Sequence, residues 1–374
     1  MGAEVNHATT SWRKLRILIA GGGTGGHVIP ALAIARQLRD AAGAEVLFLG
    51  TARGLETRLV PEAGFPLELI HVGQLKNVSI ATRLRTLLDL PLGIGRCVGL
   101  LRKFRPDVVI GVGGYASGPG MMAALLLRMP TLAFEPNAVP GLANRLVGKA
   151  VSAAAVNFEE TRRYFRNARV TGTPVRPEFF AIGERPFGTN KRLLVFGASQ
   201  GARIFNELVP RIMDRLLAAV PTLEVVHQTG ARHGDATLEI YRQLGIEMDR
   251  VRVTPYLDDM AAQFEAADLI LCRSGASTIA ELAAAGRPAL LVPFPLAADD
   301  HQRKNADAFV AAGAAEMLLE RDLTEEKLLA TLLRLLQEDT LRREMGDRAR
   351  PLAHPDAVQV IGEMVLRLAG QKAM

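Results

Sequence analysis

The chain has little of several residue types that mark particular protein classes. Aromatic residues make up only 5% of its 374 residues, and it holds two cysteines, Cys97 and Cys272, without a C-x-x-C spacing. Two cysteines so far apart predict buried thiols of a reducing compartment rather than a disulfide. The first apolar run, residues 17–20, is far too short for the hydrophobic segment of a signal peptide.

One segment resembles a membrane span in length alone. Residues 108–127 carry no charge over twenty positions, which is the length a transmembrane helix needs. Five glycines and a proline interrupt this stretch, so it is better interpreted as a buried strand, a tight loop and the start of a helix.

The length and the charge set further bounds. A chain of 374 residues is longer than a single hydrophobic core usually supports, so its length predicts two domains. Its 45 Lys and Arg against 39 Asp and Glu give a net charge of +6, which favours an anionic partner. Strand and helix patterns alternate along the chain, as in a parallel sheet with crossover helices.

The same order of strand, glycine turn and helix occurs at 15–38 and again at 192–217. The predicted fold class is therefore α/β, with two Rossmann-like domains whose parallel sheets face each other across a cleft. Two prolines within 172–177 mark the linker, giving domains 1–176 and 177–353. Apolar residues at helical spacing predict a final helix in 354–374 that crosses back to complete the first domain.

The glycine-rich segment 17–34 is the most informative stretch of the first half. A β-branched run meets five glycines between Gly21 and Gly26, and a helical pattern follows, which is typical of a phosphate or diphosphate site. The glycine spacing also fits a dinucleotide fold, but the next strand, 46–51, ends without the acidic residue that holds a cofactor ribose. His27 at the loop mouth has no use in hydride transfer, so we expect a nucleotide-type ligand other than NAD.

The second half offers two further loops of this kind. The segment 197–203 is a second candidate phosphate cradle, and a small-residue loop before Ala276 leaves another helix N-terminus open. Glu281 lies one turn beyond Ser277, where its carboxylate could accept two hydrogen bonds from a ribose diol. The residues alone equally allow a solvent-exposed helix glutamate.

Asp299 and Asp300 have no third ligand at metal-like spacing, so capping of the following helix is favoured over a divalent metal site. Gln302 just beyond them could instead face the cleft and bind a ligand.

The region 73–105 carries seven basic residues against one acid, interleaved with apolar residues. It predicts contact with an anionic membrane surface, the alternative being a solvated helix face. Phe104 is the only aromatic residue there, too few for a row of stacking side chains, which argues against nucleic acid.

Taken together, the motifs resemble the MurG family of bacterial glycosyltransferases, in order and over nearly the whole chain. The segments that carry the resemblance are 22–27, 111–119, 197–203, 273–281 and 299–302. Members of this family transfer N-acetylglucosamine from its UDP donor to lipid I, the undecaprenyl-diphosphate-linked muramyl-pentapeptide, and form lipid II. The resemblance implies a GT-B fold, a cytoplasmic-face peripheral location at the inner membrane, and a possible cell-wall synthesis or division complex.

The resemblance also implies roles for particular residues. The uracil would lie near Leu257, Glu281 would hold the ribose, and Arg176 would assist at the diphosphate. The remaining donor contacts would be Ser199, Gln302 and the helix start formed by Ala276, Ser277, Thr278, Ile279 and Ala280. The first domain would close over the sugar and the acceptor diphosphate through Thr24, Gly25, Gly26 and Asn137.

The chain departs from the family at one motif, because Phe134-Glu135-Pro136-Asn137 stands where a His-Glu-Gln-Asn sequence is usual. The general base is therefore expected to be His27, with Glu135 as its rival. Inversion at the sugar would follow a single displacement, with helix N-termini and Arg176 in place of a metal ion, and no cofactor is expected. A diacylglycerol glycosyltransferase, a UDP-N-acetylglucosamine 2-epimerase and a non-catalytic subunit of the same fold are the alternatives.

Overall fold

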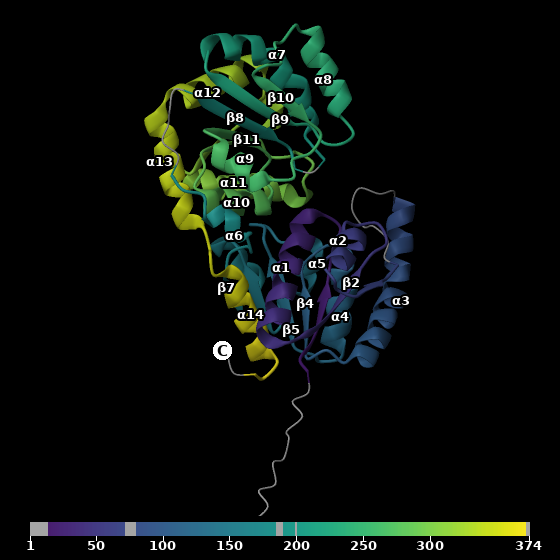
Figure 1. Cartoon of the computed structure of the whole chain (residues 1–374). Coiled ribbons are helices and arrows are strands. Elements are labelled where there is room, and N and C mark those ends of the chain that lie inside the picture. Colours follow the sequence, from purple (N-terminus) through teal and green to yellow (C-terminus); the bar gives the residue numbers. More distant parts are fainter. Residues whose placement is uncertain (1–13, 72–79, 185–189, 199, 372–374) are drawn as a thin grey trace, which may run out of the picture. The chain divides into compact units, whose positions relative to one another are not determined.

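The computed structural model describes residues 14–71, 80–184, 190–198 and 200–371, with the side chains of 80–89 excepted. Figure 1 shows helices packed around two sheets, one formed by each half of the chain. Ser199 and the first part of the predicted basic region, 73–79, lie outside the described residues.

Within the described ranges, the first sheet has seven strands in the order β3-β2-β1-β4-β5-β6-β7. Neighbouring strands pair in parallel, with Ile17 opposite Val46 on one side and Val108 on the other. The strands are β1 (Arg16–Ala20), β2 (Glu45–Gly50), β3 (Leu67–Leu69), β4 (Val108–Gly111), β5 (Thr131–Glu135), β6 (Ala153–Val156) and β7 (Ala168–Val170).

The helices of this half connect the strands as crossovers. They are α1 (Gly25–Ala42), α2 (Glu56–Glu62), α3 (Ile80–Phe104), α4 (Ser117–Leu126), α5 (Leu142–Val147), the short 3-10 helix η1 (Glu159–Tyr164) and α6 (Pro177–Phe180). Strand β4 is buried at all four residues and α4 follows it, so the interpretation of 108–127 as strand, loop and helix is confirmed. No helix in the described part of the chain has the length and apolarity needed to cross a bilayer.

The second sheet repeats the plan of the first. Its six described strands run in the order β10-β9-β8-β11-β12-β13, which is the strand order 3-2-1-4-5-6 of a Rossmann sheet. The strands are β8 (Lys191–Phe196), β9 (Leu223–Gln228), β10 (Val251–Thr254), β11 (Leu269–Cys272), β12 (Ala289–Leu291) and β13 (Ala315–Met317). The predicted duplication of the architecture is confirmed.

Alternation along β8 explains how this sheet is buried on both faces. Leu193 and Val195 belong to one apolar core, while Leu194 and Phe196 belong to the core on the other face. The helices that supply those cores are α7 (Arg203–Ala219), α8 (Gly234–Gln243), α9 (Met260–Ala266), α10 (Ala276–Ala285), α11 (His301–Ala311), α12 (Glu325–Gln337) and α13 (Asp339–Ala349). Short 3-10 turns are η2 (Ala298–Asp300), η3 (Glu320–Asp322) and η4 (Arg350–Leu352).

The chain divides into two compact units. The first unit holds residues up to Ala133, Ala150–Ser152 and residues from Gly362 onward, and the second unit holds Phe134–Lys149 and Ala153–Ile361. The last helix, α14 (Ala357–Leu368), contributes residues to both units, and Gly362 lies beside the Gln37 side chain of α1. Cys97 and Cys272 are buried free thiols, as predicted.

Candidate functional site

The glycine loop after β1 is fixed by hydrogen bonds from three consecutive amides. Gly21 N–H donates to Leu49 O at 3.0 Å, and Gly22 N–H donates to Gly113 O at 3.3 Å. Gly23 N–H donates to the Glu56 carboxylate at 2.7 Å. These amides are therefore already used. In the first turn of α1, which begins at Gly25, His27 N–H donates to Thr24 O at 3.1 Å, so the donors left for an anion are the amides of Gly25 and Gly26.

His27 is the third residue of α1 and packs against the loop that follows β4. A Cβ placed on Gly113 would lie 2.8 Å from His27 Cε1 and 3.0 Å from its Nδ1, so only glycine fits there. Gly114 is equally constrained, because its Cβ would lie 2.2 Å from Gly22 O. The loops after β1 and β4 flank the point where the strand order reverses, which is where ligands of open α/β sheets bind.

The second sheet has the equivalent switch point between β8 and β11. After β8, Ala198 and Gly201 adopt positive φ angles of 62° and 73°, and a Cβ on Gly201 would lie 1.8 Å from Thr229 O. Helix α7 follows with no side-chain cap on its N-terminus. The loop thus has the predicted strand–turn–helix geometry, although Ser199 itself is not described.

After β11, helix α10 begins with open donors. Gly275 is its N-cap and provides no side chain, and Ile279 N–H already donates to Gly275 O at 2.9 Å. The unused amides are therefore those of Ala276, Ser277 and Thr278, whereas the predicted contacts Ile279 and Ala280 lie deeper in the helix. The Ser277 hydroxyl is buried without a hydrogen-bond partner in the protein. This helix start has the donors that an anionic group requires.

The structure brings Glu281 and Arg176 together at this end of the second unit. Arg176 Nη2 lies 3.8 Å from Glu281 Oε1, and Arg176 Nη1 lies 3.6 Å from Glu178. The Glu281 side chain is only 22% exposed, so it is not the solvent-exposed helix glutamate of the alternative interpretation. Burial raises the pKa of Glu281 to about 7, against the opposing effect of the Arg176 charge.

Glu135, at the end of β5, is buried with 2% of its surface exposed. Its carboxylate accepts hydrogen bonds from Asn137 N and Nδ2, from Gly141 N and from Asn144 Nδ2, at 3.0 to 3.1 Å. Burial raises the pKa of Glu135, while these hydrogen bonds lower it in part. The carboxylate therefore holds the loop that carries Asn137, and Phe134 beside it is fully buried.

Asn305 of α11 is a site residue that the sequence motifs did not indicate. Its Oδ1 accepts from Ala138 N–H at 2.9 Å, and its Nδ2 donates to Asn137 Oδ1 and to Ser274 O, each at 3.2 Å. It thereby joins the Asn137 loop to the loop that precedes α10, within the second unit. The available signal was an asparagine, a modest helix former, within an otherwise regular helical segment.

Other predicted site residues are placed as follows. Gln302 Oε1 accepts from Phe294 N–H at 3.0 Å, and its backbone carbonyl accepts from the Ser274 hydroxyl at 2.8 Å. Leu257 is 6% exposed and packs in the core, so only its main chain can face a base. Thr24 is exposed at the start of α1.

The expectation that the aspartates cap α11 is wrong. Asp300 is the N-cap residue, but its side chain makes no capping hydrogen bond. Asp299 and Asp300 both adopt φ angles of 55°, and their carboxylates pair with Arg145 at 3.6 Å and Arg303 at 3.8 Å. In the part of the chain that the structure describes, no group of three His, Cys, Asp or Glu residues could hold a metal ion.

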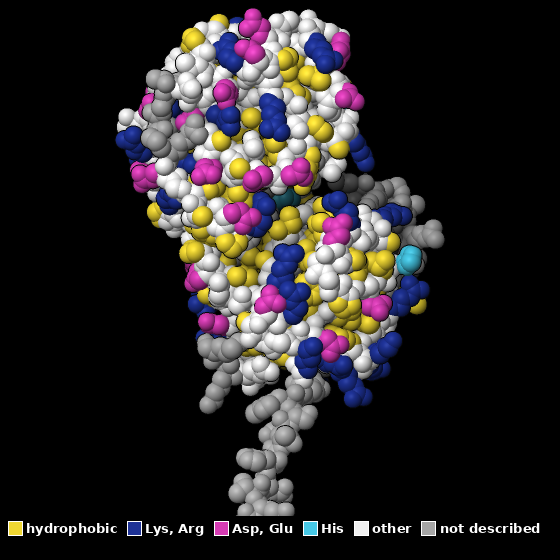
Figure 2. Space-filling view, in the orientation of Figure 1, with side chains coloured by type: hydrophobic (Ala, Val, Ile, Leu, Met, Phe, Trp, Pro, Cys, Tyr) yellow, Lys and Arg dark blue, Asp and Glu magenta, His cyan; other side chains and the backbone are white. Residues whose placement is uncertain are grey.

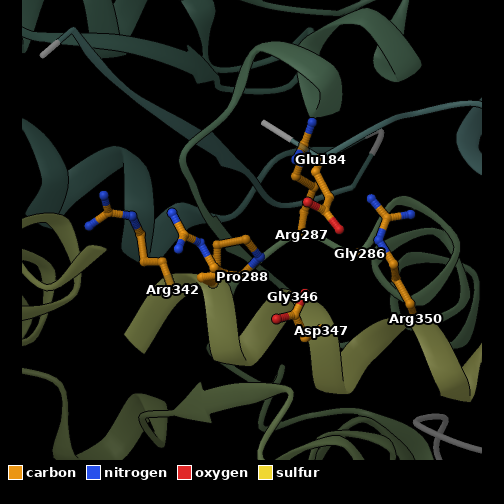
Figure 3. Close-up of a pocket in the computed structure, with 9 residues that line it drawn as sticks. Glu184, Gly286, Arg287, Pro288, Arg342, Gly346, Asp347 and Arg350 are labelled. Carbon is orange, nitrogen blue, oxygen red and sulfur yellow. The ribbon is translucent and has the colours of Figure 1, made fainter. Parts of the chain in front are cut away.

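A cavity in the second unit lies away from these residues. It measures about 40 Å³ and is lined by the turn 286–288, by residues of α13 and by Arg350 and Glu184 (Figure 3). Gly346 of α13 packs so closely on this turn that its Cβ would lie 2.6 Å from Gly286 O. A space of this size holds a few water molecules at most, so it is no site for a nucleotide sugar.

The predicted basic apolar region continues onto α3. Its described part exposes Arg96, Arg102, Lys103 and Arg105. Leu92 is 66% exposed, and Leu126 at the end of the adjoining helix α4 is 71% exposed. Figure 2 shows Lys and Arg side chains along the outer edge of α3, with hydrophobic side chains beside them. The side chains of 80–89 are not described.

Two Rossmann sheets with open helix N-termini at their switch points are typical of proteins that bind nucleotide ligands, and the comparison with known families gives the enzyme class. Models for the glycosyltransferase family 28 N-terminal domain and C-terminal domain match residues 17–156 and 192–361. The chain therefore belongs to glycosyltransferase family 28, and the resemblance found in its motifs is confirmed.

Curated relatives and a solved structure agree. The UDP-N-acetylglucosamine--N-acetylmuramyl-(pentapeptide) pyrophosphoryl-undecaprenol N-acetylglucosamine transferase of Anaeromyxobacter dehalogenans is 44% identical, over 96% of this chain and 94% of that protein. The enzyme of the same name from Nitrosococcus oceani is 44% identical over 95% and 99%. The crystal structure of Acinetobacter baumannii MurG matches with a TM-score of 0.76 and 31% identity, over 94% of this chain and 99% of that chain.

Proposed function

We propose that this protein transfers N-acetylglucosamine from UDP-N-acetylglucosamine to the C4 hydroxyl of the muramyl sugar of lipid I, forming lipid II. The observation that carries the proposal is the helix start of α10, where a buried unpartnered Ser277 hydroxyl lies one turn from Glu281 and its partner Arg176. A nucleoside diphosphate needs hydrogen-bond donors for its phosphates and an acceptor for the two hydroxyls of its ribose. One helix, α10, provides both. Family membership supplies the reaction class.

The donor would be bound by the second domain, proposed as 177–353 together with Arg176. The free amides of Ala276, Ser277 and Thr278 would hold the diphosphate, with the loop 197–201 on the other side of the switch point. Glu281 in its ionised form would accept hydrogen bonds from the two ribose hydroxyls, and Arg176 would turn from Glu281 toward the diphosphate. The main chain at Leu257 would face the uracil, and Gln302 would complete the donor contacts.

The first domain, proposed as 1–176 and completed by 354–374, would bind the acceptor. The first-turn amides of α1, with Thr24, Gly25 and Gly26, would face the acceptor diphosphate, and Asn137 would contact the sugar. His27 would take the proton from the attacking hydroxyl, because a neutral imidazole is suited to that step near pH 7. Glu135 is better suited to hold the Asn137 loop, since its carboxylate already accepts four hydrogen bonds.

The displacement inverts the anomeric centre: the C4 oxygen forms the new bond as the bond from C1 to the UDP oxygen breaks. The negative charge that gathers on UDP would be stabilised by the helix N-terminus of α10 and by Arg176. The basic and apolar region 73–105 would hold the enzyme on the cytoplasmic face of the inner membrane, where the polyprenyl acceptor resides. A cell-wall synthesis or division complex is a further proposed partner.

An acceptor panel tests the proposal against its rivals. Purified protein is given radiolabelled UDP-N-acetylglucosamine with a short-chain lipid I analogue, with diacylglycerol, or with no acceptor. We expect label on lipid I alone, and no epimerised donor in the sample without acceptor. Label on diacylglycerol, or an epimerised donor without transfer to lipid I, would overturn the assignment.

A further inference from the structure

Glu56 is a buried acidic residue to which the proposed reaction assigns no role. It opens α2 and is 1% exposed, yet no cation is paired with it in any described salt bridge. Its acceptors are filled instead by Gly23 N–H at 2.7 Å and by the backbone N–H and hydroxyl of Thr51, each at 3.0 Å. A buried carboxylate is costly unless its hydrogen bonds are made, so this arrangement is a built one.

Leu55, the residue before Glu56, binds the carbonyl group of Gly23. Leu55 N–H donates to Gly23 O at 3.1 Å, so adjacent residues of one turn grip both the amide and the carbonyl of Gly23. The following residue, Thr24, is the N-cap of α1, and its carbonyl accepts from His27 N–H at 3.1 Å. Gly23 is thus the fixed point from which the first turn of α1 and His27 are placed.

Three glycines make room for this carboxylate. A Cβ on Gly22 would lie 2.3 Å from the Glu56 side chain, one on Gly50 would lie 2.7 Å away, and one on Gly54 would lie 1.8 Å away. The loop after β1, the end of β2 and the loop before α2 therefore all close around one side chain. A role in stability alone needs no such convergence on the loop that carries His27.

We propose that Glu56 is a positioning residue for the transfer reaction: its carboxylate fixes Gly23 and thereby sets the place of His27 and of the acceptor-facing amides of α1. This inference rests on the proposed function for His27. It predicts that loss of the carboxylate impairs the chemical step and leaves donor binding unchanged, because the donor-binding residues proposed above lie in the second unit.

The test uses Glu56→Gln in the full-length protein, since the amide keeps the size but turns an N–H₂ group toward a backbone N–H. The matched control is Asp107→Asn. In the wild type the Asp107 carboxylate accepts a hydrogen bond from Arg16 N–H at 2.8 Å, at the amino ends of β1 and β4, whereas Glu56 lies at the carboxyl ends of the strands. We expect kcat to fall about 10- to 100-fold in Glu56→Gln, as for a small misplacement of a catalytic group. The donor KM should stay within twofold, and Asp107→Asn should keep the wild-type kcat.

Hydrogen exchange supplies a readout that does not depend on the reaction. In Glu56→Gln the amides of 21–27 should exchange faster than in wild type, at a temperature where both are folded, and in Asp107→Asn they should not. Faster exchange without a loss of kcat, or a loss of kcat without faster exchange, would overturn the positioning role. If the wild-type protein is inactive, the proposed function is refuted. Exchange of the amides of 21–27 that is no faster in Glu56→Gln than in wild type would refute the positioning role of Glu56, whatever the activity.

Discussion

The imidazole of His27 lies directly against the α-carbon of Gly113, so closely that a methyl group on Gly113 would sit 2.8 Å from His27 Cε1. The two residues come from different loops at the switch point of the first sheet, which are also joined by the hydrogen bond from Gly22 N–H to Gly113 O. The position of the proposed base is thus set by a neighbour that has no side chain.

Gly113→Ala should therefore displace His27. We expect kcat to fall about 10- to 100-fold, because a base moved by about an ångström loses its alignment with the hydroxyl. Gly64→Ala is the control, since its φ of 78° is close to the 88° of Gly113 but nothing lies within 4 Å of its Cβ. Both variants should lose about 1–2 kcal/mol of stability from the left-handed backbone. Equal kcat values for the two variants would contradict the prediction.

Donor binding should depend on pH through Glu281. Burial raises the pKa of this carboxyl to about 7, and only the ionised form can accept both ribose hydroxyls. The donor KM should be constant above pH 7 and should rise as pH falls below it, by at most about tenfold per pH unit for one proton. Steady-state kinetics from pH 5.5 to 8.5 measure this.

Glu281→Gln is the matched variant for that profile. Its donor KM should be raised at pH 8 and should lack the rise below pH 7, because the amide does not titrate. A variant profile that keeps the wild-type shape would assign the titration to another group.

Asn305 should contribute to stability through its three hydrogen bonds. Asn305→Ala leaves Ala138 N–H and Ser274 O unpaired in a buried site, so the free energy of unfolding should fall by about 1–3 kcal/mol. Lys304→Ala on the exposed side of the same helix should change it by less than about 0.5 kcal/mol. Urea unfolding of both variants measures the difference, and equal midpoints would show that the connection through Asn305 carries no energy.

Burial of His227 should make the free energy of unfolding fall as the pH is lowered. It is fully buried in β9 beside the Tyr241 hydroxyl at 3.0 Å, and burial lowers its pKa to about 3. The unfolded chain takes up a proton near the ordinary His pKa of about 6.5, so stability is lost as pH falls from there, by up to about 1.4 kcal/mol per pH unit. In His227→Gln this part of the slope between pH 6.5 and 5 should be absent, as urea titrations at each pH would measure; an unchanged slope would contradict it.

Much of the fold could be predicted from the sequence, because the signals were local. The strand–glycine–helix order around Gly21 and again around Gly197 predicted two Rossmann sheets, and the glycines inside 108–127 separated a strand and helix from a membrane span. The start of the first helix was less well predicted: α1 begins at Gly25, inside the glycine segment that was expected to precede it, because a glycine with low helix propensity can still occupy a first turn.

The candidate site was only partly predictable. Glu281 and Arg176 were named from the motifs, and the structure places them 3.8 Å apart. Asn305 and Glu56 were missed, because each acts through backbone groups distant in sequence, with separations of 167 and 33 residues. The capping role given to Asp300 failed because its φ of 55° is left-handed, a conformation that residue identity alone does not reveal.

The central claim is tested most directly by transfer of radiolabelled N-acetylglucosamine from UDP onto a lipid I analogue, comparing wild type with His27→Ala and Glu281→Ala. Wild type should form the labelled lipid II analogue. His27→Ala should lose about 10²- to 10⁴-fold in kcat with donor binding intact, as expected for a general base, whereas Glu281→Ala should lose donor affinity. Absence of labelled lipid II with the wild-type protein would contradict the account.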